Sequence, residues 1–157
     1  MNGKEYVIKA TTDERLVTSE LKFYIYLAKK GFPSRYYSEL LAFDNEAEVS
    51  RADKQVGRFY AILLKRYDGS LKNLLKKLNP KEKKKIVSKL KRRVKRLHEL
   101  GIVHNDLTLS NILLRRKGKG LGVLLTDFAN SKFTKDERSK KKELKRLKNI
   151  CSKILQV

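Results

Sequence analysis

The sequence predicts an α+β fold of two small lobes, and three observations lead to this prediction. Short apolar, strand-like runs dominate the first part of the chain, whereas apolar residues at helical spacing dominate the second. Between the last two predicted helices, two apolar runs at 112–114 and 123–125 flank a basic, glycine-rich stretch. Such a pattern predicts a β-hairpin. We therefore expect a reduced sheet lobe over 1–67 and a helical lobe over 68–157 that carries the hairpin.

Strand and helix signals alternate in the first lobe. Residues 5–10 form a strand-like run, and a capping box over Thr11–Glu14 then predicts the start of a helix that ends near Gly31. The Thr11 hydroxyl and the Glu14 carboxylate are placed to satisfy the first free amides of that helix. Residues 36–43 and 58–66 are again strand-like, and the link between them is polar and acidic.

Three helix starts follow in the second lobe. Ser70 is expected to cap a short helix, and Asn79–Glu82 supplies a cap, a proline at the first position and a glutamate at the third. The helix that follows should have about 20 residues and a length of roughly 30 Å. A second capping box, Thr134–Glu137, predicts the last helix. The apolar stripe of the long helix is Ile86, Val87, Leu90, Val94, Leu97 and Leu100, and that of the last helix is Leu144, Leu147, Ile150, Cys151 and Ile154.

Composition limits the possible classes of protein. Hydrophobic residues make up 40% of the 157, enough for a core, and no apolar run reaches the ~20 residues of a membrane span. The start of the chain, 1–5, does not resemble a signal peptide. The single Cys151 suits a reducing compartment, so a cytoplasmic location is expected. Two isolated histidines do not make a zinc site, and His98 is expected to be an ordinary helix residue.

Positive charge is strong and uneven along the chain. Residues 1–78 hold 15 Lys/Arg and 10 Asp/Glu, whereas residues 79–157 hold 24 and 7. A balance of +17 in the second half favours phosphate-rich partners, so binding of nucleic acid or another polyanion is expected. The alternative is a lysine-rich solvated surface of the kind that suits high temperature.

Polar residues bracket the predicted hairpin. Asp106 and Asn111 precede it, and Asp127 follows it, so Asn111 and Asp127 should lie close together at its two ends. Amide and carboxylate oxygens are ligands that Mg²⁺ accepts. The alternative is an ordinary hairpin whose ends are capped by an Asp and an Asn.

The order His104, Asp106, Asn111 and then Asp127-Phe resembles the protein-kinase-like superfamily, and the order of elements extends that resemblance along nearly the whole chain. The stretch Asp106–Asn111 is most similar to small atypical kinases of the KEOPS-complex and RIO type. The resemblance implies a minimal two-lobed kinase-like fold with ATP and Mg²⁺ as cofactors. It also implies that Asp106 is the catalytic base, that Asn111 and Asp127 hold the metal, and that His104 is structural. Kinases of the choline and aminoglycoside type have a similar loop, which keeps a small-molecule phosphotransferase in consideration.

The front of the chain extends the resemblance. Val7-Ile-Lys9 is similar to the kinase strand whose lysine holds the ATP phosphates, and the expected partner of Lys9 is Glu20. Glu20 falls inside an apolar helix stripe, where a carboxylate is costly unless it is paired. Residues 61–67 resemble the hinge between kinase lobes, so Leu64 and Arg66 are expected to contact the nucleotide.

The departures from the kinase pattern affect substrate binding more than metal binding. No glycine-rich loop precedes Lys9, Asn105 replaces an arginine, Ala129 replaces a glycine, and no A-P-E segment follows. We therefore expect a truncated kinase, with a partner chain completing its upper lobe where one is bound. The leading hypothesis is a Ser/Thr protein kinase that acts on a protein substrate or on itself. The alternatives are a catalytically weak module that binds nucleic acid or an acidic partner, and a small-molecule phosphotransferase.

Overall fold

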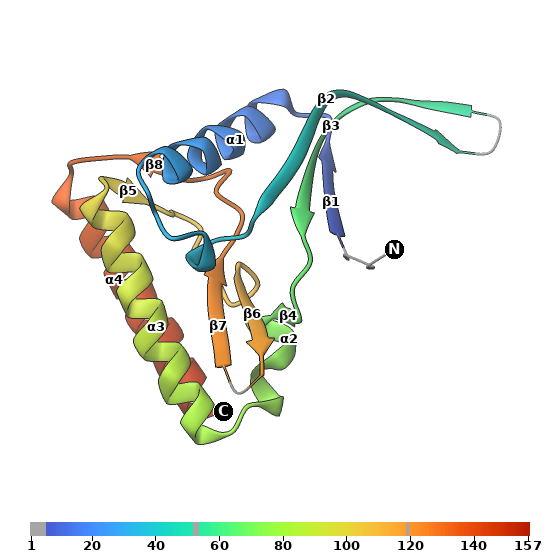
Figure 1. The fold of residues 1–157 in the computed structure, drawn as a ribbon. Helices are drawn as coiled ribbons and strands as arrows, with labels where there is room; N and C mark the ends of the chain where they lie inside the picture. The colour runs from blue at the N-terminus through green and yellow to red at the C-terminus, as the bar shows by residue number, and fades with distance from the viewer. Residues whose placement is uncertain (1–5, 52–53, 119) are drawn as a thin grey trace.

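A computed structural model describes residues 6–51, 54–118 and 120–157. The predicted α+β class is confirmed: a three-stranded sheet and one helix form the upper part, and two long helices beside a hairpin form the lower part (Figure 1). Glu5 and Lys119, which the sequence assigned to the first strand and to the hairpin turn, lie outside the described residues. Within the described residues, no helix is long and apolar enough to cross a membrane.

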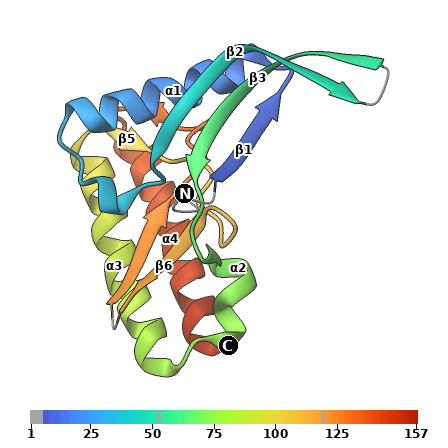
Figure 2. The same ribbon diagram turned by 45° about the vertical axis from the view of Figure 1, so that its right-hand side comes forward.

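The upper sheet contains β1 (Tyr6–Thr11), β2 (Leu40–Arg51) and β3 (Lys54–Lys65), all antiparallel in the order β1-β3-β2. The predicted strand at 36–43 began four residues too early, because Ser34–Tyr36 forms a 3₁₀ turn and β2 begins at Leu40. The predicted strands at 36–43 and 58–66 also stopped short of the polar link between them, which continues both strands into one long hairpin. Figure 2 shows this hairpin projecting past the end of β1. Backbone hydrogen bonds pair antiparallel strands whatever their side chains are. The polar residues of the link therefore did not mark the ends of β2 and β3.

Helix α1 (Glu14–Lys29) lies across one face of the upper sheet (Figure 1). The prediction that Thr11 caps this helix is wrong, because the N-cap is Asp13, whose side chain accepts from the Arg15 amide. Thr11 instead accepts from the Asp13 amide at 3.1 Å, one step outside the helix. Both residue types favour the cap, and the aspartate lies nearer the free amides. The buried face is Val17, Glu20, Phe23, Tyr24 and Leu27.

The connection to the lower part begins with β4 (Gly69–Ser70) and the short α2 (Leu71–Leu74), which Ser70 caps as predicted. Helix α3 (Pro80–Glu99) starts at the predicted capping box: the Asn79 side chain accepts from the Glu82 amide at 2.9 Å, and the Glu82 side chain accepts from the Asn79 amide at 3.0 Å. The minor elements are the 3₁₀ turns η1 (Ser34–Tyr36) and η2 (Leu75–Lys77).

The predicted hairpin is confirmed as β6 (Ile112–Lys117) and β7 (Gly120–Leu125), with Ile112 opposite Leu125. Strand β4 pairs with the other edge of β6. The loop before the hairpin starts from β5 (Ile102–Val103), and the segment after it returns as β8 (Lys132–Phe133), which pairs with β5. The two polar segments at 104–111 and 126–131 are therefore held between paired strands.

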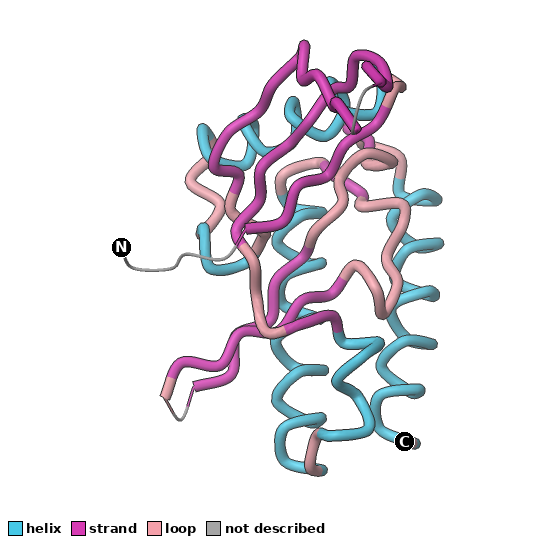
Figure 3. The backbone as a smooth tube through the Cα atoms, turned by 90° about the vertical axis from the view of Figure 1, so that its right-hand side faces the viewer, coloured by secondary structure: helices cyan, strands magenta, loops and turns pink. Residues whose placement is uncertain are grey.

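Helix α4 (Glu137–Gln156) packs along α3, and Figure 3 shows these two long helices below the upper sheet. Its N-cap is Asp136, which accepts from the Ser139 amide, rather than the predicted Thr134, for the reason given at α1. Leu144 was placed on the buried stripe, but its side chain is 45% exposed. The residue that is buried instead is Glu143.

Candidate active site

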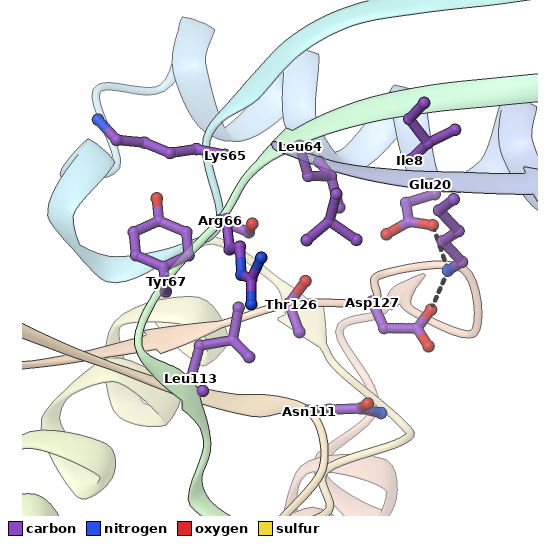
Figure 4. Close-up of a pocket in the computed structure, with 14 residues that line it drawn as sticks. Ile8, Glu20, Leu64, Lys65, Arg66, Tyr67, Asn111, Leu113, Thr126 and Asp127 are labelled. Carbon is purple, nitrogen blue, oxygen red and sulfur yellow. Dashed lines mark hydrogen bonds and ion pairs between the residues drawn. The ribbon is translucent and has the colours of Figure 1, made fainter. Parts of the chain in front are cut away.

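A cavity of about 430 Å³ lies between the upper sheet and the β6–β7 hairpin (Figure 4). Strands β1 and β3 contribute its upper wall, and the two ends of the hairpin contribute its floor. Asp106 does not line the cavity but adjoins its floor through Asn111. The other six predicted site residues all line the cavity: Lys9, Glu20, Leu64, Arg66, Asn111 and Asp127.

Lys9 joins two carboxylates that are far apart in the sequence. Its ammonium lies 2.6 Å from Glu20 Oε2 and 2.7 Å from Asp127 Oδ1. The expected Lys9–Glu20 ion pair is therefore present, and Figure 4 shows both contacts on one side of the cavity. Burial alone would lower the pKa of Lys9, but the two carboxylates outweigh burial and raise it. Burial also raises the pKa of the Glu20 carboxyl, and Lys9 offsets that effect only in part.

Asp127 and Asn111 come together at the open end of the hairpin, as the sequence predicted. The Thr126 amide donates to the Asn111 carbonyl at 3.1 Å, which ties the segment before β6 to the segment after β7. Asp127 has a φ of 64°, in the left-handed region, so the backbone turns sharply at the residue that contacts Lys9. The hairpin thus holds the two residues at fixed positions beside the cavity.

The donors at this end of the hairpin fit Mg²⁺ in a nucleotide complex. Asn111 donates its amide N–H groups to the backbone and side-chain oxygens of Asp106, at 2.9 and 3.0 Å, so its amide oxygen is the atom left for a cation. Asp127 uses Oδ1 for Lys9, which leaves Oδ2. Among the described residues, no group of three or more His, Cys, Asp or Glu side chains could hold a metal. One amide and one carboxylate suit a Mg²⁺ ion whose remaining ligands are phosphate oxygens and water.

His104 has the structural surroundings expected from the sequence. It is fully buried, and its ring lies 4.9 Å from the ring of Phe128. Its Nε2 lies 3.0 Å from the Thr126 carbonyl, so Nε2 carries the proton and donates. Burial lowers the pKa of His104, which keeps the ring neutral. His104 therefore supports the backbone directly before Asp127.

The segment after Asp127 packs against α1. The Ser19 hydroxyl donates to the Ala129 carbonyl at 2.9 Å, and the ring of Phe128 meets the ring of Tyr24 edge-on at 5.5 Å. These contacts join the helix that carries Glu20 to the segment that carries Asp127. The two acidic partners of Lys9 are thus connected by packing as well as by charge.

The loop that carries Asp106 is held from below by a residue that sequence reasoning missed. The buried Glu143 of α4 accepts from the Asn105 amide at 2.7 Å, and its other oxygen lies 2.7 Å from His98 Nε2. Arg146 donates to the Asn105 carbonyl at 2.6 Å. Asn105 has a φ of 63°, so this unusual backbone position is bonded on both sides.

These contacts correct the expectation that His98 is an ordinary helix residue, because its side chain is only 9% exposed and faces Glu143. A signal for Glu143 was present in the sequence. Glu143 lies four residues before Leu147 and seven before Ile150, so it falls within the apolar stripe of α4. Like Glu20, Glu143 is a carboxylate on an apolar helix face, where it is costly unless it has a partner.

Comparisons with known proteins show which proteins the chain is similar to. The model of the family described as "Lipopolysaccharide kinase (Kdo/WaaP) family" matches residues 49–155. The chain is 46% identical over 63 residues to the KEOPS complex subunit Bud32 of Pyrococcus abyssi, a match that covers 40% of this chain and 27% of that protein. It is 29% identical over 149 residues to the probable serine/threonine-protein kinase fhkB of Dictyostelium discoideum, covering 88% of this chain and 12% of that one.

Solved structures share the fold. The Cydia pomonella granulovirus kinase PK-1 aligns with a TM-score of 0.60 and 25% identity, over 83% of this chain and 44% of that chain. The yeast RNA polymerase II CTD kinase complex CTDK-1 aligns with the same TM-score and 19% identity, over 85% of this chain and 41% of that chain. The chain therefore spans less than half the length of each of these proteins.

Proposed function

The chain belongs to the lipopolysaccharide kinase (Kdo/WaaP) family, and we propose that it transfers the γ-phosphoryl group of ATP to a Ser/Thr hydroxyl with the help of Mg²⁺. One observation carries the proposal: Lys9 contacts both Glu20 and Asp127 at the edge of a cavity whose floor includes Asn111. Phosphoryl transfer depends mainly on positioning and charge neutralisation, and these residues supply both.

Each cavity residue has a proposed role. The Lys9 ammonium binds ATP phosphates while Glu20 holds it in place. Asn111 and Asp127 hold Mg²⁺, which when bound neutralises charge that develops on the phosphates. Leu64 and Arg66, at the end of β3, contact the base of the nucleotide. The cavity supports this orientation of the nucleotide. The apolar Leu64, proposed to contact the base, lies across the cavity from Asn111 and Asp127, which are proposed to hold the metal (Figure 4).

Asp106 is the proposed catalytic base. Asn111 donates to Asp106 Oδ2 at 3.0 Å, and no other described residue donates to the Asp106 carboxylate. Oδ1 can therefore accept a proton from the attacking hydroxyl. A general base of this kind typically contributes ~10²–10⁴-fold to the rate.

A partner protein is part of the proposal. We propose that another protein binds beside the cavity and strengthens nucleotide binding. The names of two matched proteins describe assemblies, since one is a subunit of the KEOPS complex and the other is a kinase complex. The lone Cys151 suits a reducing compartment, so we place the activity in the cytoplasm.

A second candidate acceptor follows from the family name. A family described as lipopolysaccharide kinases favours a hydroxyl that is not part of a protein, so a small-molecule or glycolipid phosphotransferase is the alternative. Both candidates use the same cavity residues and differ only in the acceptor. The acceptor must therefore be tested separately from the chemistry.

Incubation with radiolabelled ATP and Mg²⁺ tests the proposal, with three acceptor conditions: none added, a generic protein, and a lipopolysaccharide preparation. Label on protein supports the Ser/Thr assignment, and label on lipopolysaccharide alone supports the alternative. Thermal shifts with Mg-ATP then separate binding from transfer. Asp127→Ala should abolish the shift, whereas Asp106→Asn should keep the shift and lose transfer by ~10²–10⁴-fold. Leu144→Ala, at an exposed site on α4, is the control. A full wild-type shift in Asp127→Ala, or an unchanged rate in Asp106→Asn, would refute the assigned roles.

A further inference from the structure

A second cavity, of about 340 Å³, lies between α3, the β6–β7 hairpin and η1, and it shares no lining residue with the active-site cavity. Its lining contains six cationic side chains, and no acidic side chain of the described residues lines it. These cations are Arg35, Lys89, Arg92, Arg93, Arg115 and Lys117. Like charges gathered in one hollow repel one another, so this arrangement needs an anion for compensation.

Arg93 is buried in this second cavity, and no acidic side chain of the described residues pairs with it. The residue is 4% exposed, its Nη1 donates to the Lys89 carbonyl at 2.8 Å, and its guanidinium lies 4.3 Å from the centre of the Tyr36 ring. Its Nε is buried, and no hydrogen-bond acceptor for it exists in the described part of the chain. The pKa of Arg93 is lowered to about 10, mainly by burial; Tyr36 opposes the shift, and the nearby Arg92 and Arg35 add to it.

Lys89 adds to the positive electrostatic potential of the second cavity. Its side chain donates to the Leu121 carbonyl at the hairpin, so it is held at the cavity wall. Burial lowers the pKa of Lys89, and repulsion from Arg93, Lys85 and Arg92 adds to the effect. A site that holds several cations close together, at least one of them desolvated, favours a group with more than one negative oxygen.

The positive surface continues beyond the second cavity along α3. A row of basic side chains lies on one side of α3 at spacings of three or four residues. The row is about 22 Å long at 1.5 Å per residue. The Arg96 guanidinium lies 2.8 Å from the Glu99 carboxylate, which partly neutralises it. Arg96 therefore adds less to the positive surface than the other side chains of the row. A linear row of this length matches a chain of phosphates better than it matches one small anion. The row is Lys81, Lys85, Lys89, Arg92 and Arg96.

We propose that the second cavity and the row along α3 bind the phosphodiester backbone of a nucleic acid. One phosphate enters the cavity beside Arg93, and its neighbours follow the row along α3. The contacts are to phosphate, which carries no sequence information, so binding discriminates little between sequences. This site lies apart from the proposed kinase cavity, and its test does not depend on phosphoryl transfer.

Fluorescence anisotropy with labelled 20-nucleotide single strands and duplexes tests this proposal on the full chain. For three phosphate contacts on duplex DNA, the log–log salt slope of about −0.9 per contact predicts about 40-fold weaker binding at 200 mM than at 50 mM salt. The double variant Arg92→Gln/Lys117→Gln should bind at least about tenfold more weakly and reduce the slope by about 2. The matched control is Lys141→Gln/Lys145→Gln on α4, which removes the same charge at exposed positions outside the cavity and should change affinity less than about threefold.

Arg93→Met supplies a second, independent variant. Because it removes a buried cation that pairs with no acidic side chain in the described ranges, it should keep the fold and weaken binding at least as much as the double variant. If Arg93→Met fails to fold, the exposed double variant still decides the question. Equal weakening in the cavity and control variants would overturn the site, because binding would then follow total charge. Binding of inorganic phosphate or of anionic vesicles, without oligonucleotide binding at micromolar protein, would overturn the choice of nucleic acid.

Discussion

Removal of the Glu143 carboxylate should destabilise the protein more than any other single change to an acidic residue of α4. Glu143→Ala leaves two groups without their partner: the Asn105 amide and His98 Nε2, each 2.7 Å from a carboxylate oxygen. The side chains of Glu143 and His98 are 4% and 9% exposed, so water cannot replace the lost contacts easily.

The size of the effect follows from these contacts. A hydrogen bond to a charged group contributes about 1.5–3 kcal/mol, and the Glu143 carboxylate makes two such contacts. We therefore expect the free energy of unfolding to fall by about 3–5 kcal/mol, a large share of the ~5–15 kcal/mol of a typical domain. At about 2–4 °C per kcal/mol for a chain of this size, the Tm should fall by roughly 6–20 °C. Asn105 has a left-handed φ, so the loop before Asp106 should relax as well.

Urea titrations and thermal scans measure this loss, and Glu137→Ala is the matched control on the same helix. The Glu137 side chain is 69% exposed and pairs with Lys140 across one helical turn. Exposed pairs of this kind contribute little, so the control should lose less than about 1 kcal/mol. If Glu143→Ala is no less stable than Glu137→Ala, the inference that Glu143 holds the loop is wrong. Glu143→Gln, which keeps an acceptor for Asn105, should fall between the two.

Two further variants test the buried contacts of the helices. In Lys9→Met, Glu20 remains as a buried carboxyl whose pKa burial raises above the ordinary 4.5, so the folded state binds its proton more tightly than the unfolded state. The stability of this variant relative to wild type should therefore fall as pH rises from about 4 to 7, and a difference that stays constant across urea titrations in that range would contradict this. Leu147→Ala should cost about 2–5 kcal/mol and Leu144→Ala less than about 1, because Leu147 is 4% exposed and Leu144 is 45% exposed. Equal losses in denaturant titrations would mean that the two leucines are buried alike.

The features that the sequence predicted well depend on short-range rules. The capping box at Asn79 and the hairpin between Asn111 and Asp127 are set by residues that are neighbours in the chain. The ion pair of Lys9 and Glu20 spans a longer range. It was predictable because the helical wheel placed a carboxylate on a buried face, and a carboxylate there needs a cation.

The features that the sequence did not predict depend on how elements lie against one another. On a wheel of about 100° per residue, Leu147, Ile150 and Ile154 lie within about 40° of Glu143, whereas Leu144 lies about 100° away. The apolar pattern alone favours Leu144, but α3 packs on the arc that is centred near Glu143. The long β2–β3 hairpin was missed for a related reason, because backbone pairing extends beyond the apolar residues.

Glu20 and Glu143 share one feature that the sequence alone reveals. Both are acids inside the apolar stripe of a helix, and both are almost completely buried. The sequence therefore indicates that each needs a partner. For Glu20 the partner is a lysine side chain, which a motif can identify. For Glu143 one partner is the backbone amide of Asn105, and every residue except proline has such a group. An acid on an apolar stripe is thus visible in a sequence even when its partner is not, and in this chain both such acids support the residues proposed for phosphoryl transfer.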